Sequence, residues 1–309
     1  MKNPLCPLCG LEGAHKFTMP VDAKTFKPTK HGAIYECARC LFGFVHPRPT
    51  AEETNKFYDL DAYYTQGASH MVNTSAPRFS SRLRNHLAWR VDRGRSLLEV
   101  MIAELPQAAS VVDIGCGSGA LLQAMSKLGY CMTGVERDAD SLSFPNVLEG
   151  SAEALPAELP RGAYDGVVFS HVIEHIVDPI EAIRHAAALL SPSGKLFCEV
   201  PNNEAAIAMQ SGLSWEHLDV PRHINFFTER SLKRLIQQSG LIARQIYFRG
   251  YCRYFGDSYI ATEQRIHDRL PSGHGSVRNS QAHSWRLLAR TAFARSARKY
   301  DSVGIVASF

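Results

Sequence analysis

The chain has 309 residues, of which 45% are hydrophobic and 21% are charged, and its formal net charge at pH 7 is +4. These values are ordinary for a globular enzyme with one sizeable core and an accessory unit, and they give no strong electrostatic signal for nucleic acid binding. No apolar run approaches the roughly 18 residues that a membrane-spanning helix requires, so we expect no membrane partner.

Two Cys-x2-Cys pairs, Cys6 with Cys9 and Cys37 with Cys40, mark the first 50 residues. Each pair has a glycine just beyond it, which is the form of a knuckle that presents two thiolates to one ion. The chain begins without the apolar segment of a secretion signal, so we expect a cytoplasmic, reducing location that favours zinc over disulfides.

We therefore predict that residues 1–50 form a zinc ribbon in which all four cysteines hold one structural Zn²⁺. The long segment between the two pairs predicts an added hairpin. The alternative is four unrelated or redox-active cysteines. His46 has no necessary role, because the four thiolates already complete the ligand set, and His46-Pro47-Arg48-Pro49 forms a stiff link out of the ribbon.

Residues 51–309 are predicted to form one larger domain that begins with helical segments over 51–105, which we interpret as an N-terminal lid. Its aromatic residues, Phe57, Tyr58, Tyr63 and Tyr64, fit a lid or a core equally well. A second set at helical spacing predicts a helix packed on the main sheet: Leu83, Leu87, Val91, Leu97, Leu98 and Met101.

The most informative segment is 111–119, with the sequence Val-Val-Asp-Ile-Gly-Cys-Gly-Ser-Gly. It predicts a strand, a tight turn and then a helix over 120–128 that stops at Gly129. Asp113 precedes the first glycine by two residues and gives the turn a negative bias, which suits an ammonium or sulfonium ligand better than a pyrophosphate. Glu136 ends the next predicted strand, where a carboxylate can bind both hydroxyls of a ribose. A nicotinamide site is the main rival, but the third glycine comes one residue too early for it.

This pattern resembles motif I and the acidic loop of class I S-adenosylmethionine-dependent methyltransferases. The resemblance implies a Rossmann-like α/β fold: a seven-stranded, mostly parallel sheet with flanking helices, and S-adenosylmethionine as the cofactor. Ser151 stands where the family has an acid for the adenine amino group, so Glu153 is an alternative partner. The cofactor contacts implied are Asp113, Gly115, Cys116, Gly117, Gly119, Glu136, Ser151, Ala152, Glu153, Ser170 and His171.

From Ser110 onward predicted strands and helices alternate, which indicates a parallel sheet. Asp178, Pro179 and Glu181 begin a helix that we expect to reach Leu190 and to end at residues 191–194. Thr228 caps another helix, which stops at Gly240. The strands are predicted at residues 110–114, 133–136, 146–149, 166–170 and 195–200, with 241–248 and 302–308 as an antiparallel edge.

Residues 249–300 are predicted to be a helical insertion before the last strand. Five basic residues fall at amphipathic spacing on one expected helix: Arg286, Arg290, Arg295, Arg298 and Lys299. We interpret them as a solvated face rather than a contact with nucleic acid.

His171-Val172-Ile173-Glu174-His175 follows the fourth of these strands. These residues spell the inverted zinc-protease motif, but the helix start at Asp178 leaves room for only one or two helical turns, which disfavours a protease. The segment instead resembles the Glu-His pair of small-molecule methyltransferases, including ubiquinone-type O-methyltransferases and zinc-containing sugar C-methyltransferases. We predict that His175 is a general base supported by Glu174, and the alternative is a structural histidine.

The loop from Trp215 to Thr228 combines polar groups with Trp215, Phe226 and Phe227, a composition that suits a substrate wall. Its Pro-Arg-His segment also resembles that methyltransferase group. His223 is the second candidate base, and the alternative role is to orient the loop. We expect no counterpart of the additional C-terminal domain that the sugar enzymes carry, so the acceptor atom stays open.

The predicted function is methyl transfer to oxygen or carbon of a small polar metabolite, such as a sugar, a phenol or a natural-product intermediate. An RNA base methyltransferase is the first alternative, since a ribosomal guanine methyltransferase family also opens with Cys-Pro-Leu-Cys. A non-catalytic zinc-ribbon protein is the second, although the intact glycine motif and Glu136 argue against it. The sequence does not indicate an oligomeric state.

Overall fold

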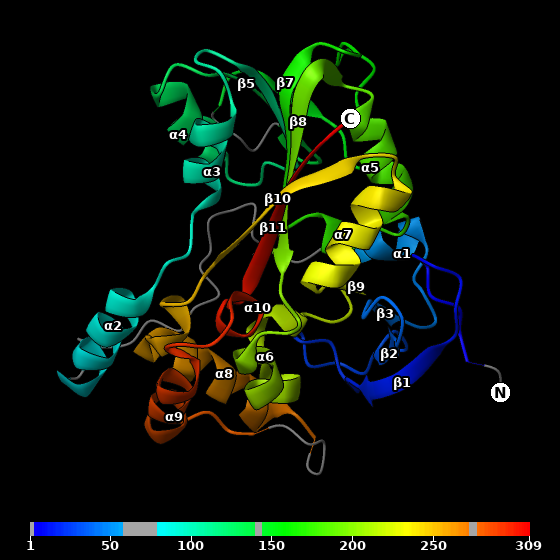
Figure 1. Cartoon of the computed structure of the whole chain (residues 1–309). Coiled ribbons are helices and arrows are strands. Elements are labelled where there is room, and N and C mark those ends of the chain that lie inside the picture. The colour runs from blue at the N-terminus through cyan, green and yellow to red at the C-terminus, as the bar shows by residue number, and fades with distance from the viewer. Residues whose placement is uncertain (1–2, 58–78, 140–143, 272–276) are drawn as a thin grey trace.

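The computed structural model describes residues 3–57, 79–139, 144–271 and 277–309. Within these ranges the main sheet has seven strands in the order β10-β11-β8-β7-β4-β5-β6 (Figure 1). The five strands from β8 to β6 are parallel, whereas β11 runs antiparallel to both β8 and β10. This topology confirms the predicted Rossmann-like fold.

All seven predicted strands are present, with ends that differ by a few residues. Alternate residues of β4 face opposite sides of the sheet, as strand geometry requires, so Val111 and Val112 belong to different core clusters. The strands are β4 Ser110–Ile114, β5 Cys131–Glu136, β6 Val147–Glu149, β7 Tyr164–Ser170, β8 Leu190–Pro201, β10 Ile242–Arg249 and β11 Ser302–Ser308.

Helices cover both faces of this sheet. On one face lie α3 (Leu97–Glu104) and α4 (Ala120–Lys127), and on the other lie α5 (Pro179–Ala187) and α7 (Glu229–Gln238) (Figure 1). The predicted caps are present, because Asp178 accepts a hydrogen bond from the Glu181 amide and Thr228 accepts one from the Ser231 amide.

The predicted helix through Leu190 is wrong at its end. α5 stops at Ala187, and residues 191–194 belong to β8. Tyr164 of β7 pairs with Leu190 and Gly166 pairs with Lys195, so the Ser-Pro-Ser-Gly segment bulges out of the ladder. A bulge tolerates a proline because no ladder hydrogen bond is required from its nitrogen.

A second group of helices packs below the sheet in Figure 1. It comprises α2 (Phe79–Val91), α6 (Ala206–Ser211), α8 (Asp257–Arg269), α9 (Gln281–Thr291), α10 (Ser296–Lys299) and the 3₁₀ turns Gly212–Ser214, Glu216–Leu218 and Arg253–Phe255.

The prediction that α2 packs on the main sheet is wrong, because α2 contacts α9 and the Arg253–Phe255 turn instead. Leu83 and Leu87 are 44% and 39% exposed. The buried residues of the helix are Ser81, Arg84 and Ala88, and Arg84 donates hydrogen bonds to the Phe255 carbonyl. Leu97 and Met101 do lie in the core, on α3.

The single basic helix predicted over 286–299 is also wrong. Arg286 and Arg290 lie on α9, whereas Arg298 and Lys299 lie on α10 after a break in the helix. Lys299 is buried and donates to the carbonyls of Val91 and Ala292, so it holds the helices together rather than facing solvent.

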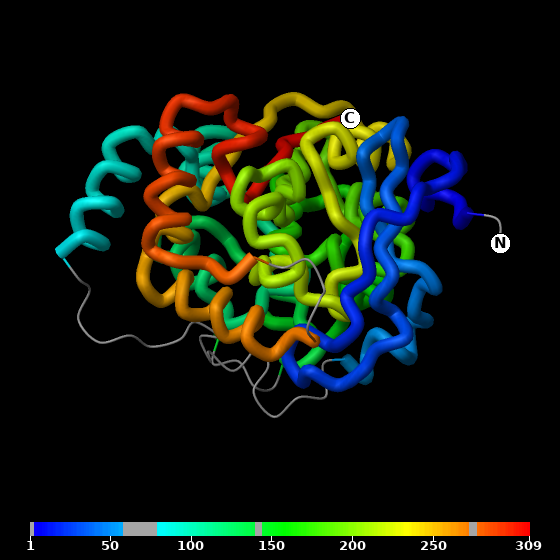
Figure 2. Tube along the Cα trace, turned by 90° about the horizontal axis from the view of Figure 1, so that it is seen from below, coloured from blue at the N-terminus to red at the C-terminus, as the bar shows by residue number. Residues whose placement is uncertain are grey.

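The N-terminal segment forms its own four-stranded sheet in the order β1-β2-β3-β9. β1 (Gly13–Thr18) and β2 (Ala33–Cys37) are the hairpin predicted between the cysteine pairs, β3 is Gly43–Val45, and β9 (Asn225–Phe226) comes from the loop before α7. The sheet is followed by α1 (Ala51–Lys56) and lies on the opposite side of the molecule from α2 (Figure 2). Across the described ranges, no helix is both long and apolar enough to cross a bilayer.

Candidate functional site

A cavity of about 910 Å³ lies at the carboxyl edge of the parallel strands. This is the edge at which open α/β sheets bind their ligands. Most of the predicted site residues line it: Asp113, Gly115, Cys116, Gly117, Glu136, Ser151, Ala152, Ser170, His171, Glu174, His175 and His223. Gly119 and Glu153 are predicted contacts that lie outside this lining.

The glycine turn after β4 adopts the left-handed backbone that its residues predict. Gly115, Gly117 and Gly119 have φ angles of +73°, +52° and +72°. A Cβ atom at Gly115 would approach Val172 Cγ2 to 2.6 Å. A side chain at Gly115 would therefore be strained both by its backbone and by its neighbour. Gly119 is the N-cap of α4, and this position explains why it supports the turn from outside the cavity.

Two carboxylates define one end of the cavity. Asp113 is 2% exposed, and its Oδ1 has no hydrogen-bond partner among the residues that the structure describes. Burial and the nearby carboxylate of Glu136 raise the pKa of Asp113 to about 7. Glu136 accepts hydrogen bonds from the amides of Gly117 (2.8 Å) and Arg137 (2.9 Å). A ligand that brings a positive charge here would relieve the cost of burying these two acids together.

The two candidate partners for a purine amino group differ in position. Ser151 lines the cavity, and its Oγ accepts a hydrogen bond from the Ala154 amide at 3.1 Å. Glu153 instead accepts a hydrogen bond from the Val177 amide at 2.9 Å and lies 3.7 Å from Arg137 Nη2. The orientation of Glu153 therefore favours Ser151 for any contact with a ligand.

A pair of histidines defines the other end. The rings of His175 and His223 are 4.6 Å apart between centroids and meet edge to face. Nδ1 of His175 lies 3.1 Å from the Arg222 carbonyl, and Nδ1 of His223 lies 2.7 Å from the His217 carbonyl. Because a carbonyl oxygen only accepts, Nδ1 carries the proton in both rings. Burial lowers the pKa of His175 and lowers the pKa of His223 to about 3, so each neutral ring keeps the lone pair of Nε2.

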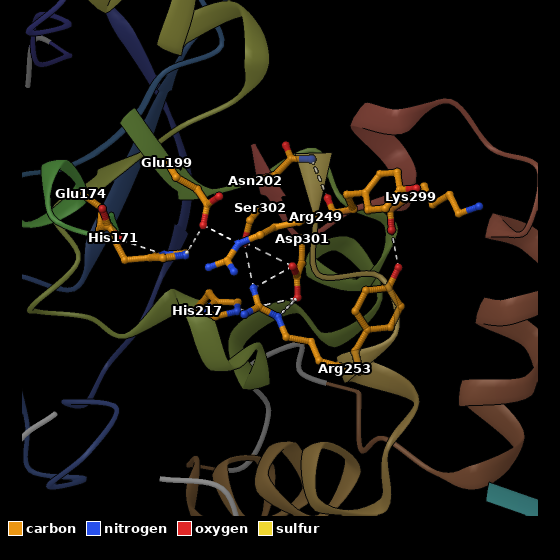
Figure 3. Close-up of polar contacts among 12 residues, drawn as sticks. His171, Glu174, Glu199, Asn202, His217, Arg249, Arg253, Lys299, Asp301 and Ser302 are labelled. Carbon is orange, nitrogen blue, oxygen red and sulfur yellow. Dashed lines mark hydrogen bonds and ion pairs between the residues drawn. The ribbon is translucent and has the colours of Figure 1, made fainter. Parts of the chain in front are cut away.

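Glu174 lies beside these rings and is 1% exposed. One of its oxygens is 3.4 Å from Nδ1 of His171 (Figure 3). Neither oxygen accepts a hydrogen bond from any described residue, and Nδ1 of His175 donates to the Arg222 carbonyl rather than to Glu174.

Two charged residues beside His171, Glu199 and Arg249, were not predicted from the sequence. His171 Nε2 lies 3.2 Å from Glu199, and Arg249 Nε lies 2.5 Å from the same carboxylate (Figure 3). Burial opposes the charged form of His171, but Glu174 and Glu199 outweigh it and raise the pKa of His171 to about 9. The one signal in the sequence was the acidic Glu199 inside the otherwise apolar run of β8.

A second ion pair extends this network. Arg253 Nε lies 2.6 Å from Asp301, and Nη2 of the same arginine donates to Ser302 (Figure 3). Arg249, Arg253 and His217 all line the cavity, so this end is polar and its opposite charges are paired.

The aromatic residues predicted to form a substrate wall have a different role. Trp215, Phe226 and Phe227 are buried in the hydrophobic core, and the loop presents its polar residues to the cavity instead. Those cavity-lining residues are Glu216, His217, Asp219 and His223. Tyr58, Tyr63 and Tyr64 lie outside the described residues, whereas Phe57 packs its ring against His31 at 5.8 Å.

The four N-terminal cysteines converge although they come from distant positions. Their sulfur atoms all lie within 4.8 Å of one another. Cys6 and Cys40 are 3.6 Å apart between sulfurs, and Cys9 and Cys37 are 3.4 Å apart. All four are free thiols. Such a cluster fits the four-sulfur tetrahedral site of a structural zinc ion.

The chain is similar to known methyltransferases. A family model described as a methyltransferase domain matches residues 84–246. Ubiquinone biosynthesis O-methyltransferase of Xanthomonas axonopodis pv. citri (strain 306) is 36% identical over an alignment of 121 residues, and the match covers 35% of this chain and 50% of that protein. The protein of the same description from Nitrosospira multiformis is 28% identical over an alignment of 153 residues, and that match covers 44% of this chain and 64% of the other protein.

Among solved structures, a SAM-dependent methyltransferase from Archaeoglobus fulgidus is 22% identical, with a TM-score of 0.48. That match covers 73% of this chain and 94% of the other. The chain spans about half the length of the Xanthomonas relative.

Proposed function

The chain belongs to the S-adenosylmethionine-dependent methyltransferases, and from this premise we propose that it methylates an oxygen atom of a small polar molecule. The observation that carries the proposal is that one cavity is lined both by the buried carboxylates of Asp113 and Glu136 and by the imidazoles of His175 and His223. The two carboxylates suit a cationic donor, and the two imidazoles suit an acceptor that must lose a proton. The curated relatives described as O-methyltransferases support oxygen as the acceptor atom.

In this proposal the glycine turn and the two acids hold the donor. The buried Asp113, with its unpartnered Oδ1, faces the positively charged methionine portion, and Glu136 accepts the ribose hydroxyls. Ser151 and Ala152 contact the adenine, while Ser170 and His171 close the cavity beside the reacting groups. S-adenosylmethionine, when bound, supplies the electrophilic methyl group.

We assign His175 and His223 to the acceptor. Glu174 lies between these two rings and the ring of His171. The rings of His175 and His223 are fixed by backbone carbonyls, so an acceptor hydroxyl meets Nε2 lone pairs that are already oriented. A neutral hydroxyl is a weak nucleophile, and help in removing its proton is their proposed task. The sequence favours His175 for this task because the end of β7, shortly before it, adjoins the donor in this fold, whereas the position of His223 depends on a loop.

We propose a structural Zn²⁺ in the cluster of Cys6, Cys9, Cys37 and Cys40, and with it the division into a ribbon over 1–50 and a catalytic domain over 51–309. All four positions are filled by thiols, so the site leaves no open position for a substrate. The ribbon instead supports the acceptor end, because β3 pairs with β9, which begins two residues after His223.

RNA is the less favoured acceptor. The basic residues of 286–299 that would contact phosphates are divided between two helices, and Lys299 is buried inside the molecule. A small molecule fits the volume of the cavity, which is in the usual range for such ligands.

The proposal is tested by supplying S-adenosylmethionine with a panel of phenols, sugars and a transcribed RNA. Mass spectrometry follows the loss of donor and the gain of a methyl group, and NMR identifies the atom that carries it. We expect an O-methyl ether of a small molecule. A methyl group on carbon, or methylation of RNA alone, would contradict the proposal.

The proposed ribose contact predicts the effect of Glu136→Ala. Loss of a charge-assisted contact to two hydroxyls should weaken S-adenosylmethionine binding by about 2–3 kcal/mol, or roughly 30- to 150-fold in Kd. Calorimetry with the purified full chain measures this change. Glu158→Ala is the matched control, because Glu158 is exposed and does not line the cavity. Equal affinity in Glu136→Ala and the unchanged protein would rule out this contact.

A further inference from the structure

We propose that Glu174, His175 and His223 bind a divalent transition-metal ion, which in turn binds the acceptor hydroxyl. These three residues are called the acceptor cluster below. The inference rests on the proposed function for the identity of the acceptor group, but the metal site stands on the geometry of the cluster itself.

The first observation is the convergence of three side chains of two types, imidazole and carboxylate, that such ions prefer. One potential ligand atom from each residue lies within 4.8 Å of the other two. The residues come from separate segments, since Glu174 and His175 follow β7 and His223 lies in the loop before β9. Two imidazoles and one carboxylate are a ligand set found at catalytic Zn²⁺ and at mononuclear iron sites, with bonds of about 2.0–2.2 Å for zinc. A small contraction of the cluster would therefore close it around an ion.

The second observation is the orientation of both rings. A histidine that binds metal through one nitrogen usually donates its other N–H to a carbonyl or a carboxylate. His175 and His223 both do so, at 3.1 Å and 2.7 Å, to the carbonyls of Arg222 and His217. Since Nδ1 carries the proton, Nε2 is the nitrogen with a lone pair. Both rings are thus fixed in the tautomer that a metal site requires.

The third observation is the carboxylate of Glu174. It is 1% exposed, and neither oxygen accepts a hydrogen bond within the described ranges. A buried carboxylate without hydrogen bonds is costly, and such groups are normally paired or bound to metal. The 3.4 Å contact with His171 supplies one opposite charge, but a carboxylate has about four lone-pair sites to satisfy. A cation between Glu174 and the two rings would satisfy more of them.

The site would also be open, in contrast to the cysteine cluster. All three residues line the cavity, and three protein ligands leave at least one coordination position for water or for the acceptor. Metal coordination lowers the pKa of a bound hydroxyl, because the ion stabilises the oxygen anion. Each side chain then acts through the ion rather than by taking the proton itself.

The chemical step balances with the groups already named. The acceptor hydroxyl R–OH binds the ion and loses its proton to water in the cavity. The alkoxide or phenoxide oxygen attacks the methyl carbon of S-adenosylmethionine and forms a new C–O bond. The S–CH3 bond breaks, its electron pair goes to sulfur, and the products are R–O–CH3 and S-adenosylhomocysteine. No oxidant or reductant is required.

The test counts metal ions in the full chain, without any acceptor. Protein loaded with Zn²⁺ alone and freed of excess metal should contain two zinc ions per chain by elemental analysis. One belongs to the cysteine cluster and one to the acceptor cluster. Glu174→Gln and His223→Ala should each contain one, and their calorimetric affinity for a second Zn²⁺ should fall at least about 100-fold. The matched control His185→Ala should keep two, because His185 is exposed on α5 and does not line the cavity.

Two further readouts distinguish loss of the metal site from unfolding of a variant and from failure of the proposed function. S-adenosylmethionine affinity within about threefold of the unchanged protein shows that a variant is folded. One zinc per chain in the unchanged protein, or a second zinc retained by both Glu174→Gln and His223→Ala, would overturn the metal site. If methylated product forms in protein with one zinc, the metal inference fails and the proposed function stands. If two zinc ions bind but no acceptor is methylated, the failure lies in the proposed function.

Discussion

A chain in which Cys37 and Cys40 are both replaced by serine should lose the zinc ion proposed for the cysteine cluster and much of its stability. Both residues are buried, and their sulfurs lie close to those of Cys6 and Cys9. Hydroxyls do not replace thiolates as zinc ligands. Structural zinc sites in small domains are worth about 10–16 kcal/mol of apparent binding free energy at pH 7, much of which is folding free energy. We therefore expect one zinc fewer per chain and a clear fall in the thermal midpoint of unfolding.

The effect should extend beyond the ribbon. β3 pairs with β9, which follows His223 in the chain. Arg48 donates hydrogen bonds to Asn225 of β9 and to the carbonyl of Val177, which follows His175. The ribbon is therefore joined to both segments that carry the two histidines. We expect the double variant to lose methyl transfer as well as zinc. Cys131→Ser is the matched control, because Cys131 is exposed and lies outside the cluster. A double variant with its full zinc content and an unchanged midpoint would contradict the assignment.

The donor end of the cavity was predictable because its residues lie in consecutive elements of the chain and form a recognisable sequence pattern. The glycines, Asp113 and Glu136 occupy a strand, a turn and a neighbouring strand, and parallel pairing brings the ends of β4 and β5 together. Glycine permits the left-handed backbone found at Gly115, and the neighbouring glycines and strand pattern mark the turn within one short segment. For the same reason the positions of the seven strands were predicted correctly, although the predicted first or last residue of several strands was wrong.

The errors arose where distant residues decide the outcome. Ser191-Pro192-Ser193-Gly194 is a common helix terminator, yet pairing with β7 makes it a bulge in a long strand. Leu83 and Leu87 have the spacing of a buried face, but the packing of α2 on α9 buries Arg84 instead. Local patterns do not specify which neighbour a helix will have, and tertiary contacts override them.

The acceptor end depends on such distant contacts almost entirely. His171 lies beside Glu199 of β8, and Arg249 at the end of β10 reaches the same carboxylate. Likewise, the partner of His175 Nδ1 is a backbone carbonyl 47 positions away, at Arg222. A backbone carbonyl has no signature in the sequence. The prediction that Glu174 supports His175 therefore named two residues that lie close together, but the ring of His175 donates its hydrogen bond to the Arg222 carbonyl.

Replacing His175 with alanine should lower turnover strongly while leaving donor binding nearly unchanged. The rate loss expected for removing a positioned acid or base is about 100- to 10,000-fold. The proposed donor contacts are Asp113 and Glu136 rather than His175, so S-adenosylmethionine affinity should stay within about threefold. Single-turnover kinetics with a saturating acceptor and calorimetry with the donor measure the two quantities separately. His185→Ala is the matched control and should keep both.

The pattern across variants identifies how the cluster works. If His175 takes the proton directly, His175→Ala should be far slower than His223→Ala, and treatment with a chelator should change neither rate. If the acceptor cluster holds a cation, turnover should fall by a similar factor in all three variants, His175→Ala, His223→Ala and Glu174→Gln. Each of these variants removes one ligand of the same ion. A chelator that leaves the cysteine zinc in place should then slow the unchanged enzyme to a similar rate. Full turnover in all three variants would mean that the cavity acts by positioning the donor and acceptor alone, and the role proposed for this cluster in removing the proton would be wrong.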